Sequence, residues 1–341
     1  MPMGGPSPVS RPARLPSVAL SLVALIGGAW LLGALFFQFD PPLRGLLMAG
    51  AAAVAMAIVA LAWTRRLAAL LVLVACLAAA AVWWASILPS NDRDWAPDVA
   101  HGVTGTIDGT SVVLHHVRDF AWRTETDADI RWVTRRYDLD DLRSVDLLTS
   151  VWDNPAIAHT LLSFGFADGR HVVFSAEIRR KRHEAFSAIG GFFKRFELVL
   201  IAAEERDIVR LRTTIRREDV SLFPLRVPPD AARRLFRSYI DRANELATRP
   251  EFYQTVTTNC TTVVVRLAQE AGRGIPLDWR ILLSGYLPDY LSDHGAIASD
   301  RPLDEIKASA KISPLARRET AGDDFSRLIR SGDLFVTATA R

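Results

Sequence analysis

Three long apolar runs occupy the first part of the chain. They cover residues 15–39, 45–63 and 67–88, and each approaches or exceeds the length of about 20 residues that crosses a bilayer core as a helix. A cleaved signal peptide is the alternative explanation of the first run, but that run is too long for one and two more follow it. The pattern therefore predicts three transmembrane helices behind a short cytoplasmic tail, residues 1–14.

Arginines flanking these runs indicate how the helices are oriented. One side of the membrane would carry four of them and the other side two: Arg11, Arg14, Arg65 and Arg66 against Arg44 and Arg93. Because positively charged loops stay in the cytoplasm, the four-arginine side is predicted to be cytoplasmic. The protein is thus expected in the bacterial inner (cytoplasmic) membrane, with everything after a linker at 89–100 in the periplasm or outside.

Short runs of alternating apolar and polar residues follow the linker, and they are typical of strands separated by turns. The first four lie at 104–107, 111–117, 130–137 and 144–151. The clearest signal comes next: His159 to Phe166 and His171 to Ile178 flank a turn that contains Asp168-Gly169. An Asp-Gly turn between two β-rich runs predicts a hairpin.

Helix-like and strand-like segments then alternate. A helix-like segment is expected at 181–194, with a charged helix among Arg179 to Glu184. Apolar runs cover 196–203 and 220–227, and a long helix should begin after Pro228-Pro229 and end near Arg249-Pro250. This mixture predicts one exported α+β domain with an antiparallel sheet over residues 101–341, and a catalytic core is expected in about 150–300.

The net charge of +3 conceals a nearly neutral exported domain. Five of the 41 basic and one of the 38 acidic residues lie in the first 90, which leaves 36 basic and 37 acidic residues beyond. Nucleic-acid binding requires a basic face, so no nucleic-acid partner is expected. The expected partner is the membrane itself.

Cys260 is the only cysteine outside the apolar runs, since Cys76 lies within the third. A thiol without a disulfide partner in an exported domain suggests reactivity. Cys260 opens an amphipathic helix, with Thr257 or Thr258 as its N-cap. Unpaired N–H groups there would lower the thiol pKa and could hold an oxyanion. The alternative is a small buried apolar residue in a structural helix.

A thiol nucleophile needs a base, usually a histidine held by a third polar group. Among seven histidines, His159 is favoured because it begins the apolar hairpin strand, whose rigidity would hold the ring. The third group could be His171 or Glu177. Glu177 is favoured because it lies nine residues after Asp168 while His159 lies nine before it, which places the two across antiparallel strands.

The sequence contains few signals for metal, cofactor or headgroup binding. One exported cysteine among scattered histidines predicts no metal site, and no phosphate loop or other cofactor motif is present, so no cofactor is expected. Arg179, Arg180 and Arg182 could contact phosphate headgroups, although a charge run is also typical of a solvated helix face.

Several segments resemble a known family. Ala158 to Phe166, Ser175 to Arg179 and Thr258 to Thr262 look like the family of the Lnb N-terminal periplasmic domain, and the likeness extends from about Val117 to Ala298. The order of histidine before cysteine also resembles circularly permuted papain-like enzymes, which include lecithin retinol acyltransferase. The resemblance implies a permuted papain-like thiol-enzyme fold.

The resemblance also implies roles for residues. Cys260 would be the nucleophile, His159 the base and Glu177 a site carboxylate, and the secondary candidates are Asn259, His171, Tyr253 and Glu197. Members with assigned activity imply transfer of an acyl chain from phospholipid, through a cysteine thioester, to the amine of a lipoprotein. Two other functions stay open: a papain-like peptidase or amidase acting on cell-wall peptides, and an inactive membrane-tethered binding domain.

Overall fold

The chain divides into two compact units. The computed structural model describes residues 14–270, 272, 276, 278–319 and 324–338. The first unit contains the described residues up to Leu88 together with Phe192–Arg195, and the second contains Pro89–Gly191 and the described residues from Phe196 onward. Of the tail expected at residues 1–14, all but Arg14 lies outside the described residues.

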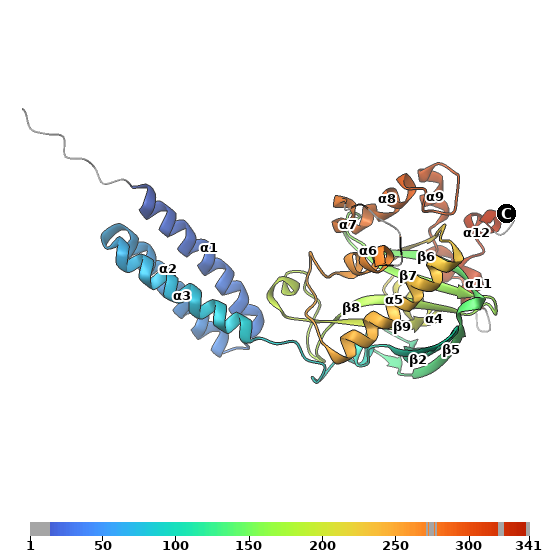
Figure 1. Cartoon of the computed structure of the whole chain (residues 1–341), viewed down its shortest axis with the longest axis horizontal. Coiled ribbons are helices and arrows are strands. Elements are labelled where there is room, and N and C mark those ends of the chain that lie inside the picture. The colour runs from blue at the N-terminus through green and yellow to red at the C-terminus, as the bar shows by residue number, and fades with distance from the viewer. Residues whose placement is uncertain (1–13, 271, 273–275, 277, 320–323, 339–341) are drawn as a thin grey trace, which may run out of the picture. The chain divides into compact units, whose positions relative to one another are not determined.

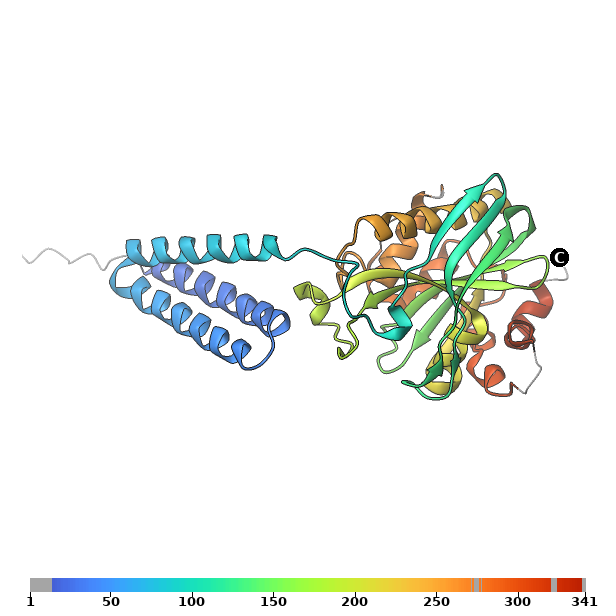
Figure 2. The same ribbon diagram turned by 90° about the horizontal axis from the view of Figure 1, so that it is seen from below.

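Three apolar helices make up most of the first unit, as predicted. They are α1 (Leu15–Gln38), α2 (Leu43–Thr64) and α3 (Arg66–Ser86), and each is long and apolar enough to cross a membrane. Small residues allow close packing, since a Cβ on Gly28 of α1 would lie 3.1 Å from the Cβ of Ala55 on α2. Figure 2 shows the three helices side by side.

An eight-stranded sheet forms the centre of the second unit, in the order β1-β2-β9-β8-β7-β6-β10, with β5 also paired to β2. Its strands are β1 (Thr104–Asp108), β2 (Ser111–Arg118), β5 (Trp132–Asp138), β6 (Leu142–Val151), β7 (His159–Phe166), β8 (His171–Arg179), β9 (Glu197–Glu204) and β10 (Asp219–Pro224). A separate pair consists of β3 (Ala121–Trp122) and β4 (Ala128–Asp129). The predicted α+β class is confirmed, but the sheet is mixed rather than antiparallel because β2 and β9 run parallel.

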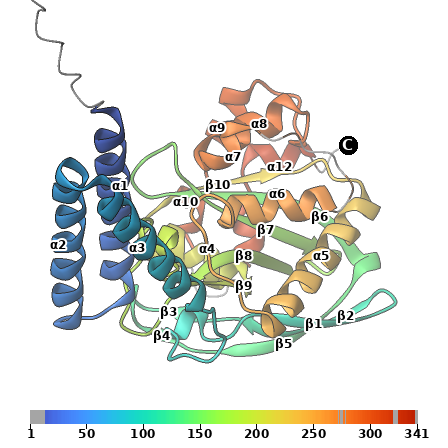
Figure 3. The ribbon, with the colours of Figure 1, turned by 60° about the vertical axis from the view of Figure 1, so that its left-hand side comes forward.

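Helices cover both faces of this sheet (Figures 1 and 3). They are α4 (Glu205–Arg210), α5 (Pro229–Thr248), α6 (Cys260–Glu270), α7 (Trp279–Leu282), α8 (Leu287–Asp293), α9 (Leu303–Ser309), α10 (Ser313–Ala316), α11 (Phe325–Ile329) and α12 (Asp333–Ala338). The long helix expected after Pro228-Pro229 is α5, which begins one residue earlier, at Pro229. The π-helix Leu211–Ile215, which continues α4, was not anticipated.

Successive side chains of the central strands pack alternately into two hydrophobic cores, one on each face of the sheet. On β9, Leu198, Leu200 and Ala202 pack in the core with α5 and α6, whereas Val199, Ile201 and Ala203 pack in the core with α4, α10 and α11. Burial on both faces explains why the central strands read as nearly continuous apolar runs. A one-residue slip of any of them would exchange the contents of the two cores.

Phe236 of α5 anchors the larger core. Its ring is fully buried and lies 5.0–6.3 Å from those of Phe164, Phe166, Phe174 and Tyr137, all near-perpendicular except Tyr137 at 66°. Edge-to-face contacts of this kind stabilise beyond the area they bury. They fasten α5 to β7 and β8, the two strands of the hairpin.

The charged helix expected near Arg179 does not form. Arg179 is the last residue of β8 and pairs with Glu197 of β9, and Lys181 then bridges to Trp95. Pairing with neighbouring segments therefore overrides the local helical pattern between Arg179 and Glu184.

We expect Phe236→Ala to destabilise the protein by about 3 to 5 kcal/mol, because it removes a buried ring and leaves a cavity among four aromatic neighbours. Thermal and denaturant unfolding of the full chain in detergent would measure the loss. Ile130→Ala is the matched control, because Ile130 is 57% exposed and should change stability little. Equal effects of the two substitutions would contradict this account of the core.

Candidate active site

The predicted hairpin forms with the expected register. Leu161 of β7 pairs with Ser175 of β8, and continuing this register by two residues places His159 opposite Glu177. The two side chains meet, with His159 Nε2 3.1 Å from Glu177 Oε1. The structure thus brings together two of the residues that the sequence proposed for the site.

Ser175 joins this pair. Its hydroxyl lies 2.8 Å from His159 Nε2 and donates to Glu177 Oε1, also at 2.8 Å. Both contacts use Nε2 of the ring, which leaves Nδ1 for another partner. The sequence contained a signal for Ser175, because residues two apart on a strand share a face and Glu177 was already a candidate.

Arg212 contacts the same carboxylate from the π-helix Leu211–Ile215. Its Nη2 donates to Glu177 Oε1 at 2.9 Å, and its Nη1 lies 3.6 Å from Glu218 Oε2. The Arg212 side chain is only 7% exposed. No local pattern marks this residue, because its role depends on α4 and the π-helix covering one face of the sheet. π-helical turns occur frequently at functional sites.

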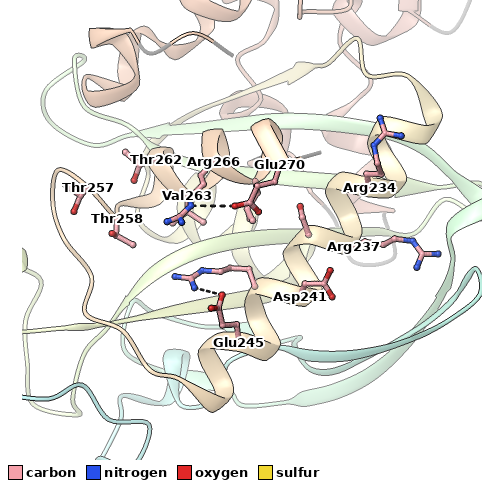
Figure 4. A pocket seen from close by; sticks show the side chains of 13 residues that line it. Arg234, Arg237, Asp241, Glu245, Thr257, Thr258, Thr262, Val263, Arg266 and Glu270 are labelled. Atoms are coloured by element: carbon pink, nitrogen blue, oxygen red, sulfur yellow. Dashed lines mark hydrogen bonds and ion pairs between the residues drawn. The ribbon is translucent and has the colours of Figure 1, made fainter. Parts of the chain in front are cut away.

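Cys260 is the first residue of α6, and Asn259 caps that helix. Asn259 Oδ1 accepts hydrogen bonds from the N–H groups of Thr261 at 3.0 Å and Thr262 at 2.8 Å. The prediction of Thr257 or Thr258 as the N-cap is therefore wrong. Those two threonines line a groove between α5 and α6 (Figure 4), where ion pairs join Arg266 to Glu270 and Arg242 to Glu245.

Among the first four N–H groups of α6, only that of Cys260 is not bonded to Asn259. Asn259 takes up the N–H groups of Thr261, Thr262 and Val263, the last through its backbone oxygen. The Cys260 N–H instead lies beside the Tyr253 hydroxyl, and burial, followed by the charges of Cys260 and Glu177, raises the pKa of that hydroxyl. The expectation of several unpaired N–H groups is thus replaced by one N–H beside a protonated phenol.

Contacts of neighbouring residues hold Cys260 close to the start of β7. The hydroxyls of Thr160 and Thr261 hydrogen-bond at 2.9 Å, which links β7 to α6. Ser284 brackets the residue before His159, since its hydroxyl donates to the oxygen of Ala158 at 2.6 Å and accepts from its N–H at 2.8 Å. Cys260 Sγ lies 4.0 Å from that same oxygen.

The electrostatics of the site favour a thiolate–imidazolium pair. Burial raises the pKa of Cys260, but the charge and hydrogen bond of His159 and hydrogen bonds from Thr160 outweigh it and lower the pKa to about 6. Burial lowers the pKa of His159, and the charge of Arg212 lowers it too. The charge of Glu177, followed by the charge and hydrogen bond of Cys260, outweighs both effects and raises this pKa to about 9. Between these values the sulfur is negative and the ring positive.

Glu177 remains ionised beside the ring. Burial favours its neutral form, but the charge and hydrogen bond of His159, then the charge of Arg212 and the hydroxyl of Ser175, hold its pKa well below the usual value. The carboxylate therefore orients the imidazole and does not compete for its proton.

A hollow of about 410 Å³ opens beside these groups. His159, Glu177, Arg212 and Tyr253 line its polar part. Trp152 and Phe186 line it as well, with ring centroids 6.5 Å apart. The ring of His159 is thus open to this hollow, beside two aromatic side chains.

Other residues proposed from the sequence lie elsewhere. His171 is beside the hairpin turn, with Nδ1 3.0 Å from the oxygen of Gly169. Glu197 is buried and pairs with Arg93 at 2.8 Å. Neither makes a hydrogen bond with the Cys260 or His159 side chain among the contacts of the described residues.

The three arginines expected at headgroups are engaged within the protein. Arg179 is buried, stacks 4.5 Å from the ring of Trp95 and donates to the oxygens of Val99 and Ala100. Arg180 and Arg182 pair with Asp98 and Asp94. Arg179 is therefore unavailable to a headgroup, because its guanidinium is buried in contacts with Val99, Ala100 and Trp95.

The family follows from comparison with known proteins. Residues 128–285 match the sequence model of the Lnb N-terminal periplasmic domain. This part of the chain belongs to that family. The Lnb N-terminal periplasmic domain so defined contains His159, Glu177 and Cys260. Together with the three apolar helices, it makes the chain a membrane-anchored protein with a periplasmic domain.

Two further searches and the metal-ligand geometry add negative findings. Neither the curated proteins nor the solved structures gave a match. Within the described residues, no group of three or more histidine, cysteine, aspartate or glutamate side chains could hold a metal ion.

Alkylation of Cys260 should follow a depressed pKa. In full-length protein carrying Cys76→Ala, we expect the rate with iodoacetamide to rise with pH through about 6, because the thiolate forms there. A free cysteine would react mainly above about 8.5. His159→Ala should move the transition upward by removing the positive partner. A transition near that of free cysteine in the unsubstituted site would contradict the ion pair.

Arg212→Met should destabilise the protein by about 3 kcal/mol, because it removes the buried guanidinium that contacts the carboxylates of both Glu177 and Glu218. Arg212→Lys keeps the charge and should cost less. Unfolding of both variants, compared with the unsubstituted chain, measures the difference. Identical stability of all three proteins would show that Arg212 does not support Glu177.

Proposed function

We propose that the protein is a membrane-anchored Cys-His thiol acyltransferase. The observation that carries the proposal is the position of Cys260 Sγ, 4.0 Å from the oxygen of Ala158 and so beside His159, whose ring Glu177 holds. This position accords with the lowered pKa of the thiol and the raised pKa of the ring. A thiol whose pKa is lowered by a histidine is the form in which cysteine acts as a nucleophile. The order of histidine strand before cysteine helix is the one that the permuted papain-like enzymes share.

In the first half-reaction, the Cys260 thiolate attacks the carbonyl carbon of a phospholipid ester. A C–S bond forms, and the carbonyl electrons move to oxygen. The Cys260 N–H and the Tyr253 hydroxyl, which lie next to one another, stabilise that oxyanion. As the tetrahedral intermediate collapses, the C–O bond of the ester breaks and the His159 imidazolium protonates the departing lysophospholipid alkoxide. The products are an acyl thioester and a neutral imidazole.

In the second half-reaction, a lipoprotein amine attacks the thioester. The amine nitrogen forms a C–N bond with the acyl carbon, and neutral His159 takes the proton that the nitrogen loses. The C–S bond breaks, and its electron pair restores the Cys260 thiolate. The cycle ends with an amide and the original ion pair.

Glu177, Ser175 and Arg212 act in this proposal as positioning residues. The Glu177 carboxylate stabilises the imidazolium, and Ser175 adds a second contact to Nε2. Arg212 neutralises Glu177 on its other side. Orientation of the imidazole matters because a general acid works only within hydrogen-bond reach of the atom that it protonates.

The choice of phospholipid and lipoprotein amine comes from the family resemblance and from the membrane anchor. A periplasmic domain tethered by three helices meets lipid esters and lipid-anchored amines at high effective concentration. The inner (cytoplasmic) membrane is the proposed location, because the arginine distribution predicts a periplasmic second unit.

An acyl-enzyme on Cys260 tests the proposal. We expect intact-mass spectrometry of full-length protein incubated with phospholipid vesicles to reveal an added mass equal to one fatty acyl chain. The adduct should be absent from Cys260→Ser and strongly reduced in His159→Ala. Cys76→Ala is the control for the other cysteine and should keep the adduct.

Two outcomes would replace acyl transfer. Release of peptide fragments from purified cell wall, with no acyl adduct, would assign the domain to the peptidase or amidase class. Lack of any adduct, together with a Cys260 thiol that resists alkylation in the folded protein, would leave a tethered binding domain.

A further inference from the structure

Exposed apolar side chains of the second unit are concentrated around the candidate active site. Apart from Ile130, every large apolar side chain that is exposed in the described part of this unit belongs to one of four segments. These segments are 152–157, 186–189, Val256 and 279–286. Phe186, Ile189 and Trp279 are 58%, 62% and 59% exposed, values more typical of charged residues.

Each segment is joined to its neighbour or to the site. The rings of Trp152 and Phe186 are in contact, and both line the hollow beside His159. Thr255, next to Val256, donates to the oxygen of Ala188 at 2.7 Å.

The segment 279–286 is joined through Gly285. Its N–H donates to the oxygen of Ala156 at 3.1 Å, and a Cβ there would lie 1.9 Å from the oxygen of Pro155. The four segments therefore form one apolar rim around the residues that hold His159 and Cys260.

Covalent connection keeps the first residues of the second unit near the bilayer. The last apolar helix ends at Ser86, and by Ser90 the chain is bonded into the second unit, its N–H donating to Glu197 at 3.2 Å. The three residues between them, 87–89, span at most about 10 Å.

The rim begins close to that tether. Arg182 donates its N–H to the oxygen of Asp94 at 2.9 Å, and Phe186 follows only four residues later. The segment that carries Phe186 and Ile189 is therefore tied to the first residues of the unit after the membrane.

We propose that this rim, with Trp152, Phe186, Ile189, Val256 and Trp279 as its main contacts, docks on the surface of the lipid bilayer that α1, α2 and α3 cross. Its aromatic side chains are of the type that concentrates at membrane–water interfaces. Contiguous exposed apolar surface of this kind marks an interaction site, and the bilayer is the apolar surface to which the chain is already fixed. The mouth of the hollow beside His159 then opens at the headgroup layer.

Site-specific fluorescence in lipid nanodiscs tests the docking. Full-length protein carrying Cys76→Ala and Cys260→Ala receives one new cysteine at a time: Phe186→Cys, Ile189→Cys or Trp279→Cys in the rim, or Ile130→Cys as the control. Ile130 is 57% exposed, so its accessibility matches that of the rim positions. Each variant is labelled with an environment-sensitive fluorophore, and thermal unfolding verifies that it remains folded.

We expect nitroxide-bearing phospholipids to quench the three rim labels and aqueous iodide to leave them largely unquenched, with the reverse pattern at position 130. Rim labels that respond like the control would overturn the proposal. Shielding from iodide without quenching by nitroxide lipid would also overturn it and would assign the rim to another protein.

The docking is independent of the proposed acyl transfer. The labelled proteins lack Cys260, so nothing in the fluorescence depends on an acyl-enzyme. A failed acylation experiment together with lipid quenching at the rim would retain the membrane surface and remove only the proposed reaction.

Discussion

The register between β7 and β8 is the constraint on which the candidate site depends. It places His159 opposite Glu177, and both point to the face where Ser175 and Arg212 complete the contacts. β8 lies between β7 and β9, and both of its faces are buried, so a slip would have to rearrange two cores at once. The stability of the sheet interior is therefore what keeps the imidazole in place.

A second requirement is that charges in this partly buried site balance one another. Glu177 lies between the ring of His159 and the guanidinium of Arg212, and the Cys260 thiol responds to the same ring. Burial alone would favour the neutral forms of the thiol, the ring and the carboxylate. Their mutual attraction outweighs burial and maintains a negative sulfur beside a positive ring near neutral pH. The site thus works electrostatically as a unit, and no member has its properties alone.

The division of the chain into two units gives the site its physical setting. Apolar helices provide the anchor, and a tether of a few residues leads to a periplasmic domain of nearly balanced charge. Apart from Ile130, the domain's described exposed large apolar residues gather where Cys260 and His159 lie, and not over its remaining surface. This distribution relates the candidate site to the membrane without requiring a basic surface.

Features that depend on residues close together in the chain could be predicted from the sequence. The three apolar helices, the hairpin with its Asp-Gly turn and the long helix α5 follow from local periodicity and turn chemistry. The hairpin spacing also indicated that His159 and Glu177 would meet, because two paired strands fix their own register. The remaining features depend on contacts between segments that lie far apart in the chain. Arg212 reaches Glu177 because a π-helix packs on the sheet, Ser284 brackets Ala158 from 126 residues away, and parallel pairing of β2 with β9 makes the sheet mixed. Strand pairing replaces the helix expected near Arg179 for the same reason. Contacts between segments distant in the chain outweigh the local helical preference, and such contacts cannot be predicted from the local pattern.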